Sequence, residues 1–560
     1  MPKWVDAHVA WPTNCLRCLP GSVLPVFRSS TWSKSPMRDS LYPYESMIHA
    51  PDAGTPRDAA FVIGHRRTVL YHKVAGSSPV RPTWQPAPRS PTRVPFHGDG
   101  TGRRAWPAHP VDVESPVGRI VGCLSGPEVH AAAMQATIIA AGSRGDVQPY
   151  VALGHGLKDA GHTVRVLASD DFRELITDHG LTFFDIGGSM ESVTRSMEGV
   201  LEGGNFLKIL STMGPTAKRL VSQAAASGLA ACEGSNLIIA GLGGLFVGLA
   251  LSEKLGIPFV PAYLYPFTPT RGFPTVLSPS PQVQLPSWAN RLSHRMGQQM
   301  MWQTFRAADN KARREVLRIA PLPFWGPFGS LEQDERTILC GYSQHVIPVP
   351  KDWGDSIHVT GYWFLDPPAG WEPPADLVTF LNSGPSPVYI GFGSMVNRKP
   401  EEVADLVLRA LERSGQRGVV SAGWGGMKTL ELPETVHMIG SIPHSWLFPR
   451  MAAVVHHGGV GTTAAGLRAG VPAVVTPFFG DQLFWGQRVH ELGVGPRPIP
   501  RRRLSVDRLA EAIHSAVSSS GMRDRSTQLG ERIRSEDGID RAVKILEQVC
   551  SATRPTPTSS

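Results

Sequence analysis

From residue 134 onward, short apolar runs alternate with amphipathic stretches. Ala136–Ala141 is apolar enough to predict a buried strand, and the glycine-containing segment Gly142–Pro149 predicts a loop after it. The pattern then predicts a helix over Tyr150–Ala160 and, after Gly161, a second strand over Thr163–Ala168. This strand, helix, strand order with apolar strands is typical of a parallel sheet.

The same alternation continues through the first half of this region. A strand is predicted over Asn236–Ala240, followed by a glycine-rich turn at 241–244, a helix that ends at Leu255 and a strand over Phe259–Ala262. We therefore expect residues 134–350 to form one open α/β domain with a Rossmann-like sheet.

A second α/β unit follows a proline-rich connection that we predict to be an interdomain linker, residues 351–372. Residues 373–550 then predict a second Rossmann-like domain with a final helix, and 551–560 a disordered tail. Two such domains facing each other predict a cleft lined by the carboxyl ends of both sheets. The expected strands and helices are Val388–Ile390, Glu401–Ser414, Gly418–Ser421, Val436–Ile439, Ala453–His456, Thr462–Ala469 and Ala473–Thr476.

Residues 1–133 lack any sustained period of two or 3.6 residues. They hold 18 of the 50 prolines, and 15 Lys and Arg against 9 Asp and Glu, which is +6 of the chain's +8. Such a segment buries too little apolar surface to offset the entropy of ordering it. We expect a disordered or spurious N-terminal extension, with Met134 as the natural start.

Composition excludes several classes of protein. No stripe of Lys and Arg interleaved with aromatic residues suggests nucleic-acid binding. Cys15 and Cys18 have no second cysteine pair or nearby histidines, so a zinc site is not expected. No apolar run reaches the ~20 residues that span a bilayer. We expect a monomeric cytoplasmic protein with at most peripheral membrane contact.

The segment Val454–Thr463, VVHHGGVGTT, carries the clearest chemistry. A strand ends, glycines turn the chain and a helix begins, so free N–H groups and the helix dipole form an anion site. His457 and Thr462 add hydrogen-bond donors that suit a diphosphate without a metal. An ordinary tight turn with capping threonines explains the glycines equally well.

Further polar residues are expected at the same edge of the cleft. Asp481 and Gln482 follow the next strand, and a carboxylate beside an amide can bind vicinal sugar hydroxyls. The loop Ser441–Trp446 offers backbone groups and an aromatic face to a base. Ser394 follows another strand.

The run from Gly440 to Val489, with HHGGVGTTAAGLRAGVPAVVTPFFGDQ at its centre, resembles the donor signature of family-1 glycosyltransferases with the GT-B fold. Within that family the chain is most similar to the sterol 3-β-glucosyltransferases and the bacterial antibiotic glycosyltransferases, and GSRGDVQPY and SEDGIDRAVKILEQ fit the same branch. The resemblance covers about residues 134–550.

The resemblance implies a role for several residues and a nucleotide-sugar donor. His457, Gly459, Gly461 and Thr462 would bind the diphosphate, and Asp481 and Gln482 the sugar, with Ser394 near either. Trp424, Pro443 and His444 would lie near the base. Ala465 stands where plant members carry a ribose-binding Glu, which leaves the nucleotide open, with UDP as the first choice. No metal or other cofactor is implied.

Asp146 is the candidate catalytic base. It lies just past the first strand of the domain, at the edge that faces the cleft, where many members of the family carry a histidine. Its alternative role is a helix cap, since Asp is favoured there. With Asp146 as base, the resemblance implies a single in-line displacement that inverts the anomeric carbon.

The acceptor is expected in the N-terminal domain. Tyr263, Tyr265, Phe267 and Phe273 are candidates for an apolar pocket, together with the Trp- and Phe-rich stretch that runs to Phe328, and ordinary core packing explains them equally well. A sterol, another lipid or a polyketide aglycone would fit, with glucose as the expected sugar. Two other functions stay open: a sugar-nucleotide epimerase of the same fold, and an inactive protein that binds a nucleotide sugar or lipid.

Overall fold

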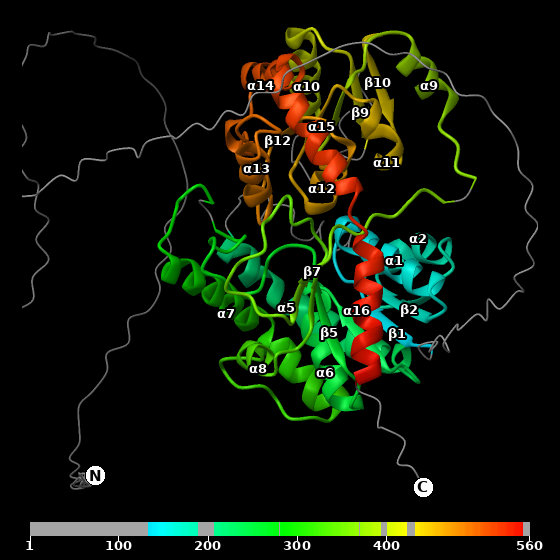
Figure 1. Cartoon of the computed structure of the whole chain (residues 1–560), viewed down its shortest axis with the longest axis vertical. Coiled ribbons are helices and arrows are strands. Elements are labelled where there is room, and N and C mark those ends of the chain that lie inside the picture. The colour runs from blue at the N-terminus through cyan, green and yellow to red at the C-terminus, as the bar shows by residue number, and fades with distance from the viewer. Residues whose placement is uncertain are drawn as a thin grey trace, which may run out of the picture. The chain divides into compact units, whose positions relative to one another are not determined.

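The apolar runs of the sequence form the strands of two parallel sheets in the computed structural model of the chain (Figure 1). The structure describes residues 133–188, 206–278, 281–368, 370–393, 400–422 and 432–552. The extension expected over 1–133 lies outside these residues except for Ala133, and so does the expected tail from residue 553 onward.

The first sheet has seven strands within the described residues, in the order β3-β2-β1-β4-β5-β6-β7. All neighbouring strands are parallel. The strands are β1 (Gln135–Ile139), β2 (Thr163–Ala168), β3 (Thr182–Asp185), β4 (Leu237–Ala240), β5 (Phe259–Tyr263), β6 (Ile338–Cys340) and β7 (Ile357–Val359). Because β1, β4 and β5 are buried on both faces, their sequences are almost wholly apolar.

Helices cover both faces of this sheet. They are α1 (Arg144–Asp159), α2 (Arg173–Thr177), α5 (Phe206–Ala231), α6 (Leu245–Leu255), α7 (Ser287–Ala312) and α8 (Phe328–Gln333). The two long helices α5 and α7 pack against each other, and Figure 1 shows α7 at the edge of this lobe. A single π-helical turn, Arg313–Leu317, follows α7.

The second sheet has five parallel strands within the described residues, in the order β10-β9-β8-β11-β12. The strands are β8 (Val388–Gly391), β9 (Gly418–Ser421), β10 (Val436–Ile439), β11 (Ala453–His456) and β12 (Ala473–Val475). Its helices are α9 (Ala375–Asn382), α10 (Pro400–Ser414), α11 (His444–Leu447), α12 (Val460–Ala469), α13 (Gln482–Glu491), α14 (Val506–Ser518) and α15 (Ser520–Arg534). This pair of α/β lobes confirms the fold class predicted from the sequence.

The last helix, α16 (Gly538–Ala552), returns to the first lobe and packs on α1. A Cβ atom on Gly156 of α1 would lie 2.2 Å from the Cγ2 atom of Ile539, so the close packing of α16 on α1 requires glycine at position 156. His162 contacts Glu547 at 3.2 Å and accepts a hydrogen bond from the backbone N–H of Met134. The two ends of the described chain therefore meet on one lobe.

Two features differ in detail from the sequence prediction. The helix expected from Tyr150 begins six residues earlier, at Arg144, because Asp146 accepts a hydrogen bond from the backbone N–H of Ser143 and so stabilises the first turn. The helix continues through Pro149, which lacks a backbone N–H group. The strand β7 falls within the segment 351–372 that was expected as a linker, and it extends the first sheet beyond β6.

The described helices are too short or too polar to span a bilayer. None of those in residues 133–188, 206–278, 281–368, 370–393, 400–422 and 432–552 is long and apolar enough to cross a membrane.

Leu546 tests how much α16 stabilises the first lobe. Its side chain is fully buried, so Leu546→Ala should lower the free energy of unfolding by about 2–5 kcal/mol, and thermal unfolding with denaturant titration would measure it. Gln548→Ala, an exposed change on the same helix, is the control and should be nearly neutral. An equal effect of the two changes would contradict a stabilising role for the buried face of α16.

Candidate active site

Both sheets reverse their strand order at one point, and the loops at those points carry the candidate site. In the first sheet the reversal lies between β1 and β4, and in the second between β8 and β11. Loops at the carboxyl ends of strands on either side of such a point bound the usual binding crevice of an open α/β sheet. Asp146 follows β1, and His457 follows β11.

The loop after β11 ends at the N-terminus of α12. Gly459 is the N-cap residue, and Gly461 and Thr462 lie in the first turn, where backbone N–H groups have no partner within the helix. Gly458 has a φ of 92°, and a Cβ there would lie 2.7 Å from Val475, so this turn requires glycine. This strand, glycine turn and helix N-terminus have the local geometry on which the predicted anion site depends.

The imidazole of His457 lies beside this helix end. Burial lowers the pKa of His457 to about 4, so the ring is neutral at pH 7. Its Nδ1 atom is buried and has no hydrogen-bond partner among the described residues. The ring packs against Gly393, whose φ of 63° and lack of a side chain leave room for it. His457 is therefore a neutral, buried imidazole beside the N-cap residue of α12.

His456 differs from its neighbour. It is fully buried, its Nδ1 atom accepts a hydrogen bond from the backbone N–H of Gly458 at 3.0 Å, and burial lowers its pKa to about 3. The two rings are nearly perpendicular, at 86°. His456 therefore stabilises the glycine turn through Nδ1, although its Nε2 atom, like Nδ1 of His457, is buried without a hydrogen-bond partner among the described residues.

Asp481 and Gln482 lie at the start of α13. Asp481 accepts a hydrogen bond from Trp485 Nε1 at 3.0 Å, and burial raises its pKa to about 7, with the negative charge of Asp146 adding to the effect. The amide oxygen of Gln482 accepts the N–H group of Phe478 at 2.8 Å. Gln482 therefore fixes the loop that positions Asp481.

Asp146 occupies the first turn of α1 and faces the cavity described below. Its Oδ2 atom accepts hydrogen bonds from the backbone N–H and the hydroxyl of Ser143, each at 2.8 Å. Burial raises the pKa of Asp146, and these two hydrogen bonds oppose the rise. Both roles expected for Asp146, helix stabilisation and an acid or base at the cleft, are compatible with this geometry.

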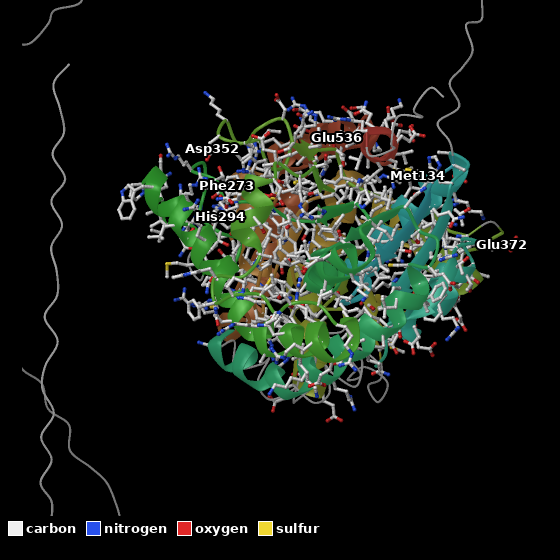
Figure 2. All side chains as sticks on the ribbon, turned by 90° about the horizontal axis from the view of Figure 1, so that it is seen from below. Met134, Phe273, His294, Asp352, Glu372 and Glu536 are labelled. Carbon is white, nitrogen blue, oxygen red and sulfur yellow. The ribbon has the colours of Figure 1, made fainter. Side chains whose placement is uncertain are left out.

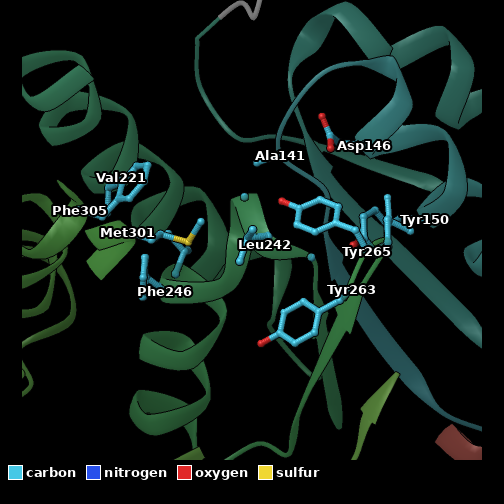
Figure 3. Close-up of a pocket in the computed structure, with 14 residues that line it drawn as sticks. Ala141, Asp146, Tyr150, Val221, Leu242, Phe246, Tyr263, Tyr265, Met301 and Phe305 are labelled. Carbon is cyan, nitrogen blue, oxygen red and sulfur yellow. The ribbon is translucent and has the colours of Figure 1, made fainter. Parts of the chain in front are cut away.

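A cavity of about 250 Å³ opens beside Asp146. Figure 3 shows tyrosines on one side of it and side chains from α5, α6 and α7 on the other. Tyr263 and Tyr265, both predicted for an acceptor pocket, line this cavity. The lining residues are Ala141, Asp146, Tyr150, Val221, Gly241, Leu242, Gly243, Phe246, Val247, Tyr263, Leu264, Tyr265, Met301 and Phe305.

The other two aromatic candidates lie outside the lining. Phe267 is 2% exposed and packs on Tyr263 and Phe328 in the core. Phe273 lies beside His294, as Figure 2 shows, and also contacts Phe484 of α13. Met301 and Phe305 of α7 fall in the Trp- and Phe-rich stretch that was also a candidate for this pocket. The sequence did not predict the lining residues of α5 and α6, because only the packing of helices brings them to β1 and β5.

The two lobes meet at this site. A Cβ on Gly461 would lie 3.3 Å from the Cα of Gly145, so the first turns of α12 and α1 are in close contact. Arg144 donates a hydrogen bond from Nη1 to the hydroxyl of Ser441 at 3.3 Å. Burial and the charges of Asp481 and Asp146 raise the pKa of Tyr265. Groups from both lobes therefore share one electrostatic environment.

The remaining candidates divide between described and undescribed residues. Pro443 is the N-cap residue of α11, and His444 stacks on Phe448 with ring centroids 4.2 Å apart. Ser394 and Trp424 lie outside the described residues. In the described part of the chain, no group of three or more His, Cys, Asp or Glu side chains is arranged to hold a metal ion.

Two family models match the chain. Residues 136–274 match the "Glycosyltransferase family 28 N-terminal domain". Residues 421–549 match the "Erythromycin biosynthesis protein CIII-like, C-terminal domain". The first match contains Asp146 and the second contains His457 and Asp481, so each lobe of the candidate site falls within a matched region.

Curated relatives extend over both lobes. The chain is 35% identical over 444 residues to sterol 3-beta-glucosyltransferase UGT80B1 of Arabidopsis thaliana, covering 76% of this chain and 70% of that protein. It is 37% identical over 424 residues to sterol 3-beta-glucosyltransferase UGT80A2 of the same plant, covering 73% of this chain and 65% of that protein. With a sterol 3-beta-glucosyltransferase of Cryptococcus neoformans it shares 34% identity, over 79% of this chain and 28% of that protein. The match thus spans less than two thirds of UGT80A2 and of the fungal protein.

Solved structures of antibiotic glycosyltransferases share the fold. The glycotransferase of kitacinnamycin superposes with a TM-score of 0.55 at 19% identity, covering 74% of this chain and 99% of that chain. The spinosyn forosaminyltransferase SpnP has a TM-score of 0.53 at 14% identity, covering 75% and 100%. At these identities the likeness concerns the arrangement of the two lobes alone.

The neutral state of His457 is directly testable. Because burial lowers its pKa to about 4, its ring resonances should not titrate between about pH 5 and 8 in histidine-labelled NMR spectra, with assignment by His457→Asn. A resonance of His457 that moves with a midpoint near 6.5, the ordinary value, would show that the ring is not desolvated as described.

Proposed function

Because the chain belongs to the family-1 glycosyltransferases, in the branch of the sterol 3-beta-glucosyltransferases, we propose that it transfers a hexose from a UDP-sugar to a hydroxyl of a lipophilic acceptor. The anomeric configuration of the sugar is inverted in this reaction. Glucose is the proposed sugar, as the names of the relatives suggest.

One observation carries the proposal: Asp146 borders both an apolar cavity and the anion site of the other lobe. Its carboxylate faces the cavity that Tyr263 and Tyr265 line. The same carboxylate acts electrostatically on Asp481, which lies at the start of α13. A hydrophobic alcohol in the cavity and a nucleotide sugar on the second lobe would therefore meet at Asp146.

Asp146 is the proposed general base. An acceptor hydroxyl in the cavity donates its proton to the carboxylate as its oxygen attacks the anomeric carbon, and the bond from that carbon to the diphosphate breaks. A raised carboxylate pKa makes Asp146 a stronger base than an exposed aspartate, as long as it is ionised. Ser143 holds the carboxylate in place through two hydrogen bonds.

His457 and α12 are proposed to stabilise the leaving diphosphate. Negative charge builds up on the departing oxygen, and preorganised donors in a desolvated site stabilise it most. His457 contributes a neutral N–H group, and the first turn of α12, with Gly461 and Thr462, contributes backbone N–H groups and the helix dipole. The proposal assigns no part of this work to a metal ion.

Asp481 is proposed to bind sugar hydroxyls, with Gln482 in support. The Asp481 carboxyl accepts a hydrogen bond from Trp485 through one oxygen, and a carboxylate has acceptor sites beyond that one for the hydroxyls of a ligand. Pro443 and His444 are proposed to lie at the base of the nucleotide, as the family resemblance implies. Ala465 leaves the ribose contact open, so the choice of UDP rests on the family resemblance rather than on a residue.

The acceptor is proposed to be a sterol, another lipid or a polyketide aglycone. The relatives named above are sterol 3-beta-glucosyltransferases. The cavity fits such a molecule in character, because its walls are mainly aliphatic and aromatic, with Asp146 as their charged group. An epimerase would not need an apolar cavity beside its carboxylate, so this observation favours transfer.

A panel of donors and acceptors tests the proposal. Purified full-length protein would be incubated with UDP-glucose, UDP-galactose or dTDP-glucose and with sterols, fatty alcohols or polyketide aglycones, and the products identified by mass spectrometry. A glycosylated lipophile with inverted linkage by NMR supports the proposal. Conversion of the donor to an epimer without transfer, or binding without any turnover, would support the two alternatives.

Asp146→Asn should keep donor binding and lose transfer. Asn can still accept a hydrogen bond from Ser143 but cannot take a proton, so kcat should fall by about 10²–10⁴-fold while the Kd for UDP changes little. Asp170→Asn, an exposed aspartate just after β2, is the control and should retain activity. Turnover by Asp146→Asn at the wild-type rate would rule out Asp146 as the base.

The raised pKa of Asp146 predicts an acid limb in the pH profile. Because protonated Asp146 cannot accept a proton, kcat/KM should fall as the pH drops through a midpoint above the ordinary Asp value of about 3.9. Asp481, whose pKa is raised to about 7, is already protonated at that pH, so Asp481→Asn should leave the midpoint in place even though it lowers the rate. A midpoint that moves to lower pH in this variant would show that Asp481 is still charged where Asp146 titrates.

A further inference from the structure

Exposed apolar side chains are concentrated on one part of the first lobe. Among the described residues, eight large apolar side chains are exposed, and six of them lie on α7, just before it, or on the loop after it. Trp288 and Trp325 are 70% and 73% exposed. These six residues, here called the α7 apolar face, are Val283, Trp288, Leu292, Met296, Phe324 and Trp325.

The first half of this face follows from helical geometry. Trp288, Leu292 and Met296 are spaced by four residues, so their side chains lie in a row along one side of α7. The row is about 12 Å long, from eight residues at 1.5 Å each. A row of this kind on a surface helix normally faces a core, yet all three side chains are exposed.

The second half is supplied by the loop that follows α7. The side-chain amides of Gln299 and Gln303 both donate hydrogen bonds to the carbonyl of Phe324, at 3.1 and 2.7 Å. Arg306 lies over the Phe324 ring, 5.4 Å from its centroid. Gln299, Gln303 and Arg306 continue the side of the helix that Met296 occupies, so Phe324 and Trp325 extend the same face.

The charge around this face is positive. Residues 281–308 contain Arg291, Arg295 and Arg306 and no Asp or Glu before Asp309. Arg291 and Arg295 lie 3.6 and 3.2 Å from Glu332, and Asp352 also interacts electrostatically with Arg291. Three arginines against these two acidic residues leave a net positive charge beside the exposed tryptophans, which favours a partner whose apolar surface is bordered by negative charge.

The opposite side of α7 lines the cavity beside Asp146. Met301 and Phe305 project into that cavity, as Figure 3 shows. At about 100° per residue, Met301 and Phe305 lie about 180° and 220° round the helix axis from Leu292, the middle of the row, and therefore on the opposite side of α7. One helix therefore separates an apolar cavity from an apolar, exposed and positively flanked outer face.

We propose that the α7 apolar face docks on the surface of a lipid bilayer that contains anionic headgroups. Tryptophan side chains favour the boundary between hydrocarbon and water, and arginines beside them attract anionic lipids. A second copy of the chain would bring the arginines of two equal faces together, which disfavours self-association through this face. Docking is separate from the transfer reaction and needs neither donor nor acceptor.

Vesicle flotation with the full chain tests this proposal. The probes are vesicles of phosphatidylcholine alone and vesicles with about 30 mol% phosphatidylglycerol. The protein should bind the second kind more tightly, and added salt should weaken that binding because exposed charges are screened. Trp288→Ser with Trp325→Ser should weaken binding by about tenfold or more. Met296→Glu, a single exposed change, gives an independent second test with the same expected direction.

Leu255→Ser with Val349→Ser is the matched control, because both residues are exposed and apolar but lie outside this face. It should bind vesicles as the wild type does. The proposal is overturned if the wild type fails to bind, or if both α7 variants bind as the wild type does. It is also overturned if light scattering shows a dimer that the double tryptophan variant dissociates without any vesicle binding. Loss of transfer with intact vesicle binding would count against the proposed function alone.

Discussion

The candidate site depends on the contact between the first turns of α1 and α12. Gly145 and Gly461 meet there without side chains, which lets helices from two different sheets approach end to end. Two helix N-termini in contact repel each other, since both carry partial positive charge. Asp146, in the first turn of α1, offsets this repulsion from one side. An anionic ligand on α12 would offset it from the other, so the contact itself favours a negatively charged group at the lobe boundary.

Burial at this boundary shifts acids and bases in opposite directions, and both shifts suit the proposed chemistry. It raises the pKa values of Asp146 and Asp481 and lowers that of His457. The result is a carboxylate with more affinity for a proton beside an imidazole that stays neutral. Desolvating these groups costs stability, which the apolar packing of both sheets and the docking of α16 on α1 offset.

The donor half of the candidate site follows from local sequence more directly than the acceptor half does, for a physical reason. The anion site lies within one continuous strand, turn and helix, so local glycines and His457 are enough to identify it. The cavity is assembled from β1, β5 and helices α5 to α7, and no local pattern shows that Met301 lies opposite Tyr265. Phe267 and Phe273 are near Tyr263 and Tyr265 in the sequence, but Phe267 packs in the core and Phe273 against His294 and Phe484.

The two apolar sides of α7 explain why periodicity alone did not predict this helix. Met301 and Phe305 lie on one side and Trp288, Leu292 and Met296 on the other, so the sequence lacks the single apolar stripe of an ordinary surface helix. A helix with two apolar sides requires two apolar partners. The cavity wall and α5 provide the first within the lobe. For the outer side, the proposed partner is a lipid bilayer. Such a bilayer would also hold the lipophilic acceptor that the cavity on the inner side is proposed to bind.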